Sequence, residues 1–243
     1  ADGTYTYTAT GRDQAENWGS GATRTVVIDT TDPVVAFGAP TPADGTQTNQ
    51  PQTITVTAAD ANIDKIEIVV NGSIQKTCAA SPCSLLLNTT NTYAFYGRAT
   101  DKAGNNADTE TRTILIDMIA PTIVFETPPT PMNGTCVVSD SVTITVTSNE
   151  AIAGTAMLQW NGVSEAMTGG GVNWTATKSG LQVPGIYTFR VYGSDAVGNV
   201  GWSEIRMFGL DYWDTDNDGI LNACDPETLI SADTTLAAGE YLF

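Results

Sequence analysis

A single stretch decides the fold: Asn91-Thr92-Tyr93-Ala94-Phe95-Tyr96-Gly97-Arg98-Ala99-Thr100-Asp101-Lys102-Ala103-Gly104-Asn105. Its first half alternates aromatic residues with small or polar ones, the period-2 pattern of a strand with one buried face. At Asp101 the pattern changes, because an aspartate there can accept hydrogen bonds from the backbone N–H groups ahead of it, and Gly-Asn provides a left-handed backbone position. The stretch therefore predicts a strand that ends in a tight corner.

The same stretch occurs three times in the chain. The corner aspartates are Asp13, Asp101 and Asp195, and each corner leads to a short apolar strand that ends in an aspartate. The corners are separated by 88 and 94 residues (13 to 101 and 101 to 195), and a period near 90 is the length of one small β-sandwich. We interpret the three corner aspartates as turn-building residues and not as catalysts.

Proline junctions follow the first two copies, at Asp29-Thr30-Thr31-Asp32-Pro33 and Asp117-Met118-Ile119-Ala120-Pro121. Proline fixes φ and cannot donate to a strand ladder, so these junctions are expected to be short and stiff. Alternating segments such as residues 53–58 and 142–147 lie between the junctions. They give about seven short strands per repeat, which is typical of a sandwich.

Composition excludes several classes of function. The 243 residues carry a net charge of −17, which disfavours nucleic acid as a partner, because phosphate binding needs clustered Lys and Arg. The chain has no histidine, so Ser-His-Asp and Cys-His catalysis are impossible and the commonest zinc ligand is missing. Paired carboxylates could still hydrolyse glycosides, but the acidic residues fall at turns, at junctions and in one acidic loop. We therefore predict that the protein is not an enzyme.

The most specific motif is the acidic loop Asp214-Thr215-Asp216-Asn217-Asp218-Gly219-Ile220-Leu221-Asn222-Ala223-Cys224-Asp225. Its oxygen ligands follow the spacing of a calcium loop, and glycine at position 6 permits the sharp bend. The predicted Ca²⁺ ligands are Asp214, Asp216, Asp218, Asn222, Asp225 and the backbone carbonyl of Ile220. A solvated acidic turn is the alternative. Asp60-Ala61-Asn62-Ile63-Asp64 is a weaker acidic candidate, which we expect to cap a turn.

Four cysteines are present in the chain. An even number in a threonine-rich β-protein favours disulfides and an oxidising compartment over a zinc site. We predict that Cys78 pairs with Cys83 across a short loop, and that Cys136 pairs with Cys224.

Other surface features are less specific. Asn-x-Ser/Thr triplets permit glycosylation at Asn71, Asn88, Asn133 and Asn173. Exposed tryptophans could form a sugar platform, although most of Trp18, Trp160, Trp174 and Trp202 are expected in the core or at junctions. Gly169-Gly170-Gly171 lacks the context of a phosphate cradle and predicts a flexible loop. No apolar run approaches the roughly 20 residues that a membrane helix needs.

The motif Tyr-x-Phe-x-x-x-Ala-x-Asp-x-Ala-Gly-Asn with its Ile-Asp-x-x-x-Pro junction resembles the bacterial and archaeal Ig-like repeats of large surface proteins, over about residues 1–211. The acidic loop looks like a thrombospondin type 3 calcium repeat. The resemblance implies an all-β fold of tandem Ig-like β-sandwich domains, joined by short proline junctions and followed by a calcium-binding loop. The expected parts are the C-terminal part of a sandwich (1–32), two sandwiches (33–119 and 120–211), a calcium-binding linker (212–227) and the start of further β-structure or a donor strand (228–243).

Two functions remain open. The first is a structural or adhesive module of an extracellular cell-surface protein, such as a stalk, surface layer or filament, which calcium makes rigid. The alternative is a set of accessory carbohydrate-binding or spacer domains of a secreted enzyme. The expected partners are copies of the chain or neighbouring domains of a longer one, and possible further partners are surface glycans. Residues 1–32 match only the last two strands of a repeat. We therefore expect a tandem polypeptide or a polymer in which one subunit completes the next.

Overall fold

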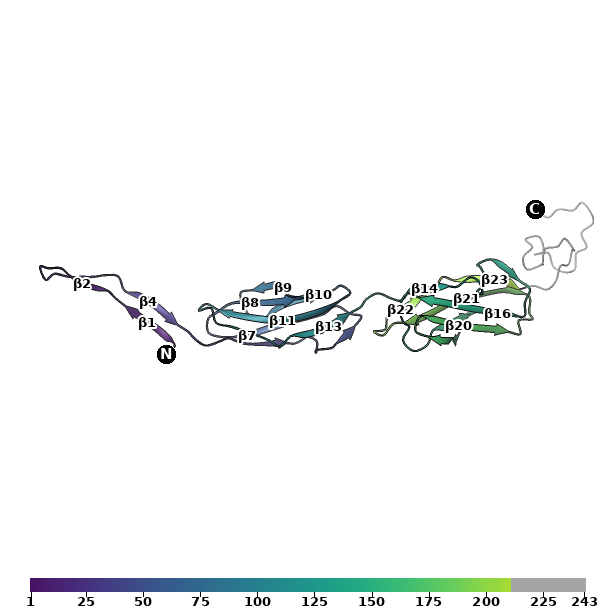
Figure 1. Ribbon diagram of the computed structural model, residues 1–243, viewed down its shortest axis with the longest axis horizontal. Coiled ribbons are helices and arrows are strands. Elements are labelled where there is room, and N and C mark those ends of the chain that lie inside the picture. The colour runs from purple at the N-terminus through teal and green to yellow at the C-terminus, as the bar shows by residue number, and fades with distance from the viewer. Residues whose placement is uncertain (211–243) are drawn as a thin grey trace, which may run out of the picture. The chain divides into compact units, whose positions relative to one another are not determined.

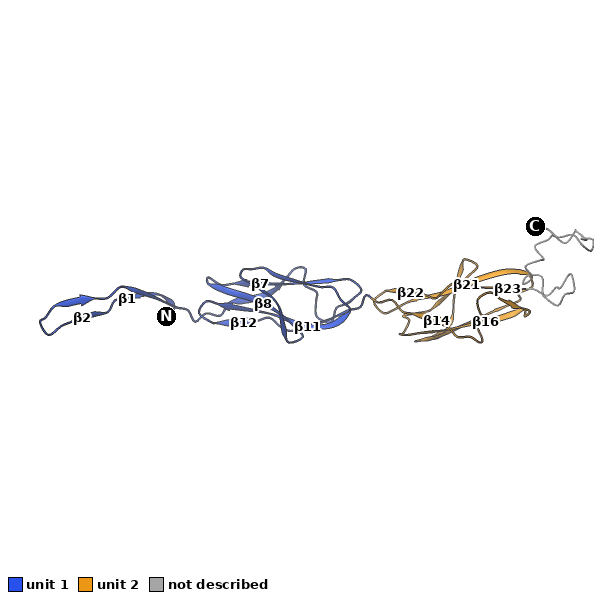
Figure 2. Ribbon diagram, turned by 90° about the horizontal axis from the view of Figure 1, so that it is seen from above, with its two compact units in different colours: residues 1–118 blue, residues 119–243 orange. Residues whose placement is uncertain are grey.

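The computed structural model describes residues 1–210, and all of their regular structure is β-strand (Figure 1). The chain divides into two compact units, Ala1–Met118 and Ile119–Phe243, which are coloured separately in Figure 2. The first unit contains a hairpin and a sandwich, and the described part of the second unit is a sandwich. Within residues 1–210 the structure has no helix that is long and apolar enough to span a membrane.

The sandwich of the first unit consists of two sheets. The smaller sheet has the strand order β10-β7-β5, and the larger has the order β6-β13-β11-β8-β9, with β12 paired to β11. The strands are β5 (Val34–Gly38), β6 (Gln47–Thr48), β7 (Gln52–Ala59), β8 (Ile63–Val70), β9 (Ser73–Cys78), β10 (Cys83–Leu87), β11 (Asn91–Asp101), β12 (Asn106–Asp108) and β13 (Arg112–Ile116).

The second unit repeats this plan. Its sheets have the orders β14-β16-β20-β19 and β15-β23-β21-β17-β18, with β22 paired to β21. The strands are β14 (Ile123–Phe125), β15 (Thr135–Val137), β16 (Ser141–Ser148), β17 (Met157–Trp160), β18 (Val163–Ala166), β19 (Thr168–Gly170), β20 (Asn173–Ser179), β21 (Gly185–Ser194), β22 (Val200–Trp202) and β23 (Arg206–Leu210). The fold class is thus all-β, with tandem Ig-like sandwiches.

Each sandwich has its own core because apolar residues alternate with polar ones along the strands. On β16, Val142, Ile144 and Val146 are buried, and the threonines between them are not. An aromatic pair recurs in both cores: Phe37 meets Phe95 edge-on at a centroid distance of 5.5 Å, and Phe125 meets Phe189 at 5.3 Å. Such pairs add to the stabilisation that comes from burial.

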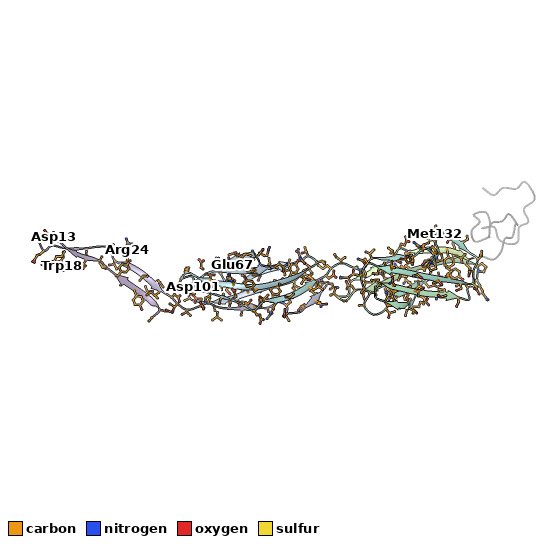
Figure 3. All side chains as sticks on the ribbon, viewed as in Figure 1. Asp13, Trp18, Arg24, Glu67, Asp101 and Met132 are labelled. Atoms are coloured by element: carbon orange, nitrogen blue, oxygen red, sulfur yellow. A yellow bond between two sulfur atoms is a disulfide. The ribbon has the colours of Figure 1, made fainter. Side chains whose placement is uncertain are left out.

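The hairpin at residues 1–32 repeats the end of a sandwich without the rest of it. It consists of β1 (Gly3–Tyr7), β2 (Thr10–Arg12), β3 (Trp18–Ser20) and β4 (Arg24–Ile28), with β1 paired to β4 and β2 to β3. None of residues 1–32 is buried. Figure 3 shows Asp13 and Trp18 at the corner end of this hairpin, away from Arg24.

The three corners are built as the sequence predicts. The Oδ1 atom of Asp101 accepts backbone hydrogen bonds from Ala103, Gly104 and Asn105 at 2.7–2.9 Å. Gly104 has a φ of 97°, in the left-handed region that favours glycine. Asp195 and Asp13 accept the corresponding N–H groups of Asn199 and Asn17 at 2.9 Å each.

The triple glycine differs from the expected flexible loop. Gly169 and Gly170 belong to β19, which pairs with β20. Gly169 has a φ of 148°, and a Cβ atom there would lie 2.2 Å from the main-chain oxygen of Asn173. The glycine therefore permits a close strand approach, and the prediction of a loop was wrong.

Candidate metal centre

The acidic loop lies outside the described residues. Asp214, Asp216, Asp218, Ile220, Asn222 and Asp225 are all C-terminal to residue 210, and so is Cys224. Their predicted Ca²⁺ ligation, and the predicted pairing of Cys136 with Cys224, stay predictions.

Three aspartates of the first unit come together. Asp29, Asp60 and Asp101 each place a carboxylate oxygen within 4.8 Å of the others. Asp101 is buried, and Asp29 and Asp60 are half-buried. Carboxylate oxygens are the ligands that hard divalent cations prefer, so this buried acidic cluster could hold a metal ion.

Each aspartate of the cluster is positioned by its local backbone. Asp101 is fixed by the corner after β11. Asp60 follows β7, and its Oδ1 atom accepts the backbone N–H of Asn62 at 2.7 Å, which is the predicted turn cap. Asp29 directly follows β4, and its main-chain oxygen accepts the side-chain amide of Asn105 at 3.0 Å. The side chain of Asn62 also donates to the Asp29 carboxylate, at 3.4 Å.

The hydrogen bonds of the corner keep Asp101 charged. Burial raises the pKa of Asp101, but the side chain of Asn105 and the backbone N–H groups of residues 103–105 together outweigh burial and hold the pKa below its usual value. A carboxylate has about four lone-pair directions, so Asp101 can accept these bonds and still face a cation.

The second unit has two acidic residues at equivalent positions of the repeat. Glu150 lies after β16 as Asp60 lies after β7, and Asp195 directly follows β21, whereas its counterpart Asp101 is the last residue of β11. Their carboxylate oxygens lie within 4.8 Å of each other. Burial raises the pKa of Asp195, but hydrogen bonds from Asn199, Val197 and Gly198 hold it below its usual value.

Sequence reasoning missed the cluster of the first unit. It singled out Asp60 and Asp64, but Asp64 is exposed and is not a member of the cluster. It treated Asp29 only as the end of a strand and Asp101 only as a turn builder. The signal that could have found the cluster is the recurrence of an acidic residue at all three positions: Asp117, Glu150 and Asp195 occupy them in the next repeat.

The disulfide between Cys78 and Cys83 joins the two sheets of the first sandwich. Cys78 ends β9, Cys83 begins β10, and the two form a disulfide with a Cα–Cα distance of 5.6 Å. Cys136 lies on β15 with its side chain exposed.

The four glycosylation triplets differ in their surroundings. All four asparagines are exposed, but Asn71 and Asn133 also bind neighbouring backbone groups through their side chains. Asn71 accepts the backbone N–H of Ala94 at 2.9 Å and donates its amide to Thr92 at 3.4 Å. Asn133 accepts the N–H of Met207 at 3.0 Å. Asn88 and Asn173 are therefore the positions where a glycan would disturb the fold least.

The tryptophans do not form a shared platform in the described residues. Trp160 and Trp174 lie in the core of the second unit, whereas Trp18 and Trp202 are exposed. Trp202 packs against Tyr192 at a centroid distance of 4.3 Å, and the guanidinium of Arg190 lies 3.9 Å from the Trp202 ring centroid.

Part of the chain is similar to a known protein family. Residues 33–111 match the family model described as bacterial Ig domain. Among curated proteins, none matches the chain.

Several solved structures resemble the chain at low identity. Titin domains I67–I69 share 11% identity with a TM-score of 0.46, covering 85% of this chain and 74% of the other. A structure concerning host cell surface retention of a bacterial ice-binding adhesin shares 18% with a TM-score of 0.36, covering 88% and 76%. Fibronectin(III)-like modules of Clostridium thermocellum CbhA share 14% with a TM-score of 0.34, covering 73% and 93%. The family match spans most of the first sandwich, and the same strand plan continues in the second.

Proposed function

We propose that this chain is a structural or adhesive segment of an extracellular bacterial surface protein, and that calcium stiffens it. The observation that carries the proposal is the cluster of Asp29, Asp60 and Asp101 at the point where the hairpin joins the first sandwich. The bacterial Ig domain match supports it, because such domains are typical of surface proteins.

The chemistry of the cluster favours Ca²⁺. Carboxylates this close repel one another unless a cation lies between them. Ca²⁺ accepts six to eight oxygen ligands in flexible geometry, so three carboxylates, backbone carbonyls and water can complete its shell, whereas Mg²⁺ demands a near-ideal octahedron. A bound ion would link Asp29, at the end of the hairpin, to Asp60 and Asp101 of the sandwich. The segment that begins at residue 29 would then lose its freedom to move, which is what stiffening means here.

The same proposal includes the acidic loop. Asp214, Asp216, Asp218, Asn222, Asp225 and the carbonyl of Ile220 would hold a second Ca²⁺. We propose a non-catalytic role, with neighbouring domains or copies of the chain as partners, and surface glycans as possible ligands. The net charge of −17 argues against nucleic acid. The carbohydrate-binding alternative has less support, because Trp160 and Trp174 are core residues and ring or guanidinium contacts occupy Trp202.

Hydrogen exchange of the full chain tests the proposal, because it locates each ion. With Ca²⁺ in place of a chelator, residues 29–32 and 101–105 should exchange more slowly, and the loop at 214–225 should respond separately. At a Ca²⁺ concentration of 100 times Kd the ion should add about 3 kcal/mol to the free energy of unfolding.

Matched variants assign the effect to the cluster. Asp60→Asn keeps the size of the side chain and removes one charge, so the response at residues 29–32 should disappear. Asp64→Asn removes a neighbouring charge outside the cluster and should leave that response intact. Equal exchange with Ca²⁺ and with chelator in the unsubstituted chain would show that calcium does not stiffen this segment.

A further inference from the structure

The closing hairpins of the three repeats share one pairing register. We use "closing hairpin" for the pairs β1–β4, β11–β13 and β21–β23. Tyr5 faces Val26 in the first, Tyr93 faces Ile114 in the second, and Tyr187 faces Phe208 in the third. A backbone bond beyond each pair also recurs at 2.8 Å: Gly21 donates to Ala9, Thr109 to Gly97, and Ser203 to Val191. The first hairpin is therefore the same structural part as the other two.

Only the first closing hairpin lacks a covering layer in the described residues. Its apolar face consists of Tyr5, Tyr7, Val26 and Ile28, which are 44%, 55%, 43% and 43% exposed. The equivalent residues of the second hairpin, Tyr93, Phe95, Ile114 and Ile116, are 8%, 0%, 1% and 0% exposed. Strands β7 and β8 supply much of the core around them, including Ile54, Val56, Ile66 and Ile68. A connected apolar face of this kind is typical of a binding surface.

An arginine at the edge of the apolar face gives a second, independent indication of what covers the face. Arg112, opposite Phe95, places its guanidinium 4.5 Å from the ring centroid of Phe37 and donates to the main-chain oxygen of Pro42 at 3.0 Å. Arg206, opposite Phe189, lies 4.7 Å from the ring of Phe125 and donates to Pro131. In each sandwich the aromatic ring belongs to the first strand. Arg24 occupies the same place opposite Tyr7, which fits a partner whose first strand brings an aromatic ring.

We propose that the face of Tyr5, Tyr7, Val26 and Ile28 binds the strands of a further Ig-like repeat, counterparts of β5 to β10, which precede the hairpin in the same polypeptide. The order follows from both complete sandwiches, where these strands come before the closing hairpin. A second copy of the chain does not supply them, because its own hairpins already cover its β5–β10 and β14–β20 layers. The partner adds a neighbouring antiparallel strand to β1, as β8 does to β11, and apolar side chains to the face.

Two fusions test this proposal on the full chain. The first places a copy of residues 33–88 directly before Ala1, which keeps the 88-residue spacing. It carries Ala9→Gly, because a Cβ atom at the equivalent Gly97 would lie 2.5 Å from Val56. The second places a copy of residues 121–182 before Ala1, with Cys136→Ser in the copy. This second fusion keeps Ala9, because the residue equivalent to Ala9 in the copied repeat is Val191.

Amide exchange at residues 3–7 and 24–28 is the readout. In at least one fusion it should slow by about a hundredfold relative to the unfused chain, because the amides then open only with a complete sandwich. Val26→Asp in that fusion should abolish the protection and leave residues 33–118 protected. Two results would overturn the proposal: fast exchange of the hairpin in both fusions, or concentration-dependent protection of the unfused chain with self-association in sedimentation, which would make a second copy the partner.

Discussion

The side-chain amide of Asn105 donates a hydrogen bond of 3.0 Å to the main-chain oxygen of Asp29, which lies 76 residues earlier. The same amide donates to the Oδ2 atom of Asp101 at 2.8 Å. One side chain thus connects the corner of the sandwich to the residue that ends the hairpin, and both of its partners belong to the acidic cluster.

Asn105→Ala should therefore weaken Ca²⁺ binding, because Asp29 and Asp101 lose the group that holds them together. Calorimetric titration of the full chain should show roughly a tenfold loss of affinity at this site, the scale seen when a group that orients a metal ligand is removed. The control is Asn173→Ala, which removes an exposed asparagine of the second unit and should leave the Ca²⁺ affinity unchanged. Unchanged affinity in Asn105→Ala would mean that the bond does not organise the cluster.

Acid should destabilise both units. The folded-state pKa values of Asp101 and Asp195 are lowered, so the folded state favours the ionised form more than the unfolded state does. This contribution is fully present above the ordinary aspartate pKa of about 4, and it is lost as the pH falls through the lower folded-state value. Thermal unfolding followed by circular dichroism in Ca²⁺ should show a constant Tm above about pH 5 and a falling Tm below about pH 4. A Tm that rises on acidification would contradict this assignment.

Phe95→Ala should cost about 3–5 kcal/mol, because it removes a fully buried ring and its contact with Phe37. Tyr7→Ala at the equivalent position of the first hairpin is the matched control, and its exposed ring should contribute little to stability. Calorimetry measures the loss. Tryptophan fluorescence assigns the loss to the first unit. Trp160 and Trp174 lie in the core of the second unit, so their unfolding transition should not move. Similar losses in the two variants would indicate that the hairpin face is already covered.

Removal of the Cys78–Cys83 disulfide should lower the free energy of unfolding of the first unit by about 2 kcal/mol, the chain-entropy value for so short a loop. The variant Cys78→Ser with Cys83→Ala removes the bond and keeps the buried site at Cys83 apolar. Urea unfolding measures the difference, and a reductant should abolish it in the unsubstituted chain. No difference between the oxidised chain and the variant would show that the bond does not stabilise the unit.

Much of the fold could be predicted from the sequence because it depends on interactions between residues close together in the chain. Alternation along residues 91–101 predicted β11, and the aspartate at the corner predicted hydrogen bonds that are present at Asp13, Asp101 and Asp195. These features depend on residues a few positions apart. The prediction failed at Gly169, where the decisive contact is with the backbone of the neighbouring strand.

The acidic cluster could not be predicted in the same way, because three separate segments bring its members together. Asp29 follows β4, Asp60 follows β7, and Asp101 ends β11. No spacing rule connects residues 29, 60 and 101, whereas the loop at 214–225 has its ligands within twelve consecutive positions and stands out by spacing alone.

The larger sheet of each sandwich has a parallel strand pair at one edge, and this pair has a mechanical consequence. β6 runs parallel to β13 over two residue pairs, Gln47–Leu115 and Thr48–Ile116, while β15 runs parallel to β23 over three. When tension pulls the early and late strands of a unit apart, the hydrogen bonds of the parallel pair are loaded in shear. These bonds then carry the force together, so they must break at once and not one after another. Each sandwich is therefore expected to resist stretching through its short parallel pair, and a unit should extend only when all the bonds of that pair have broken.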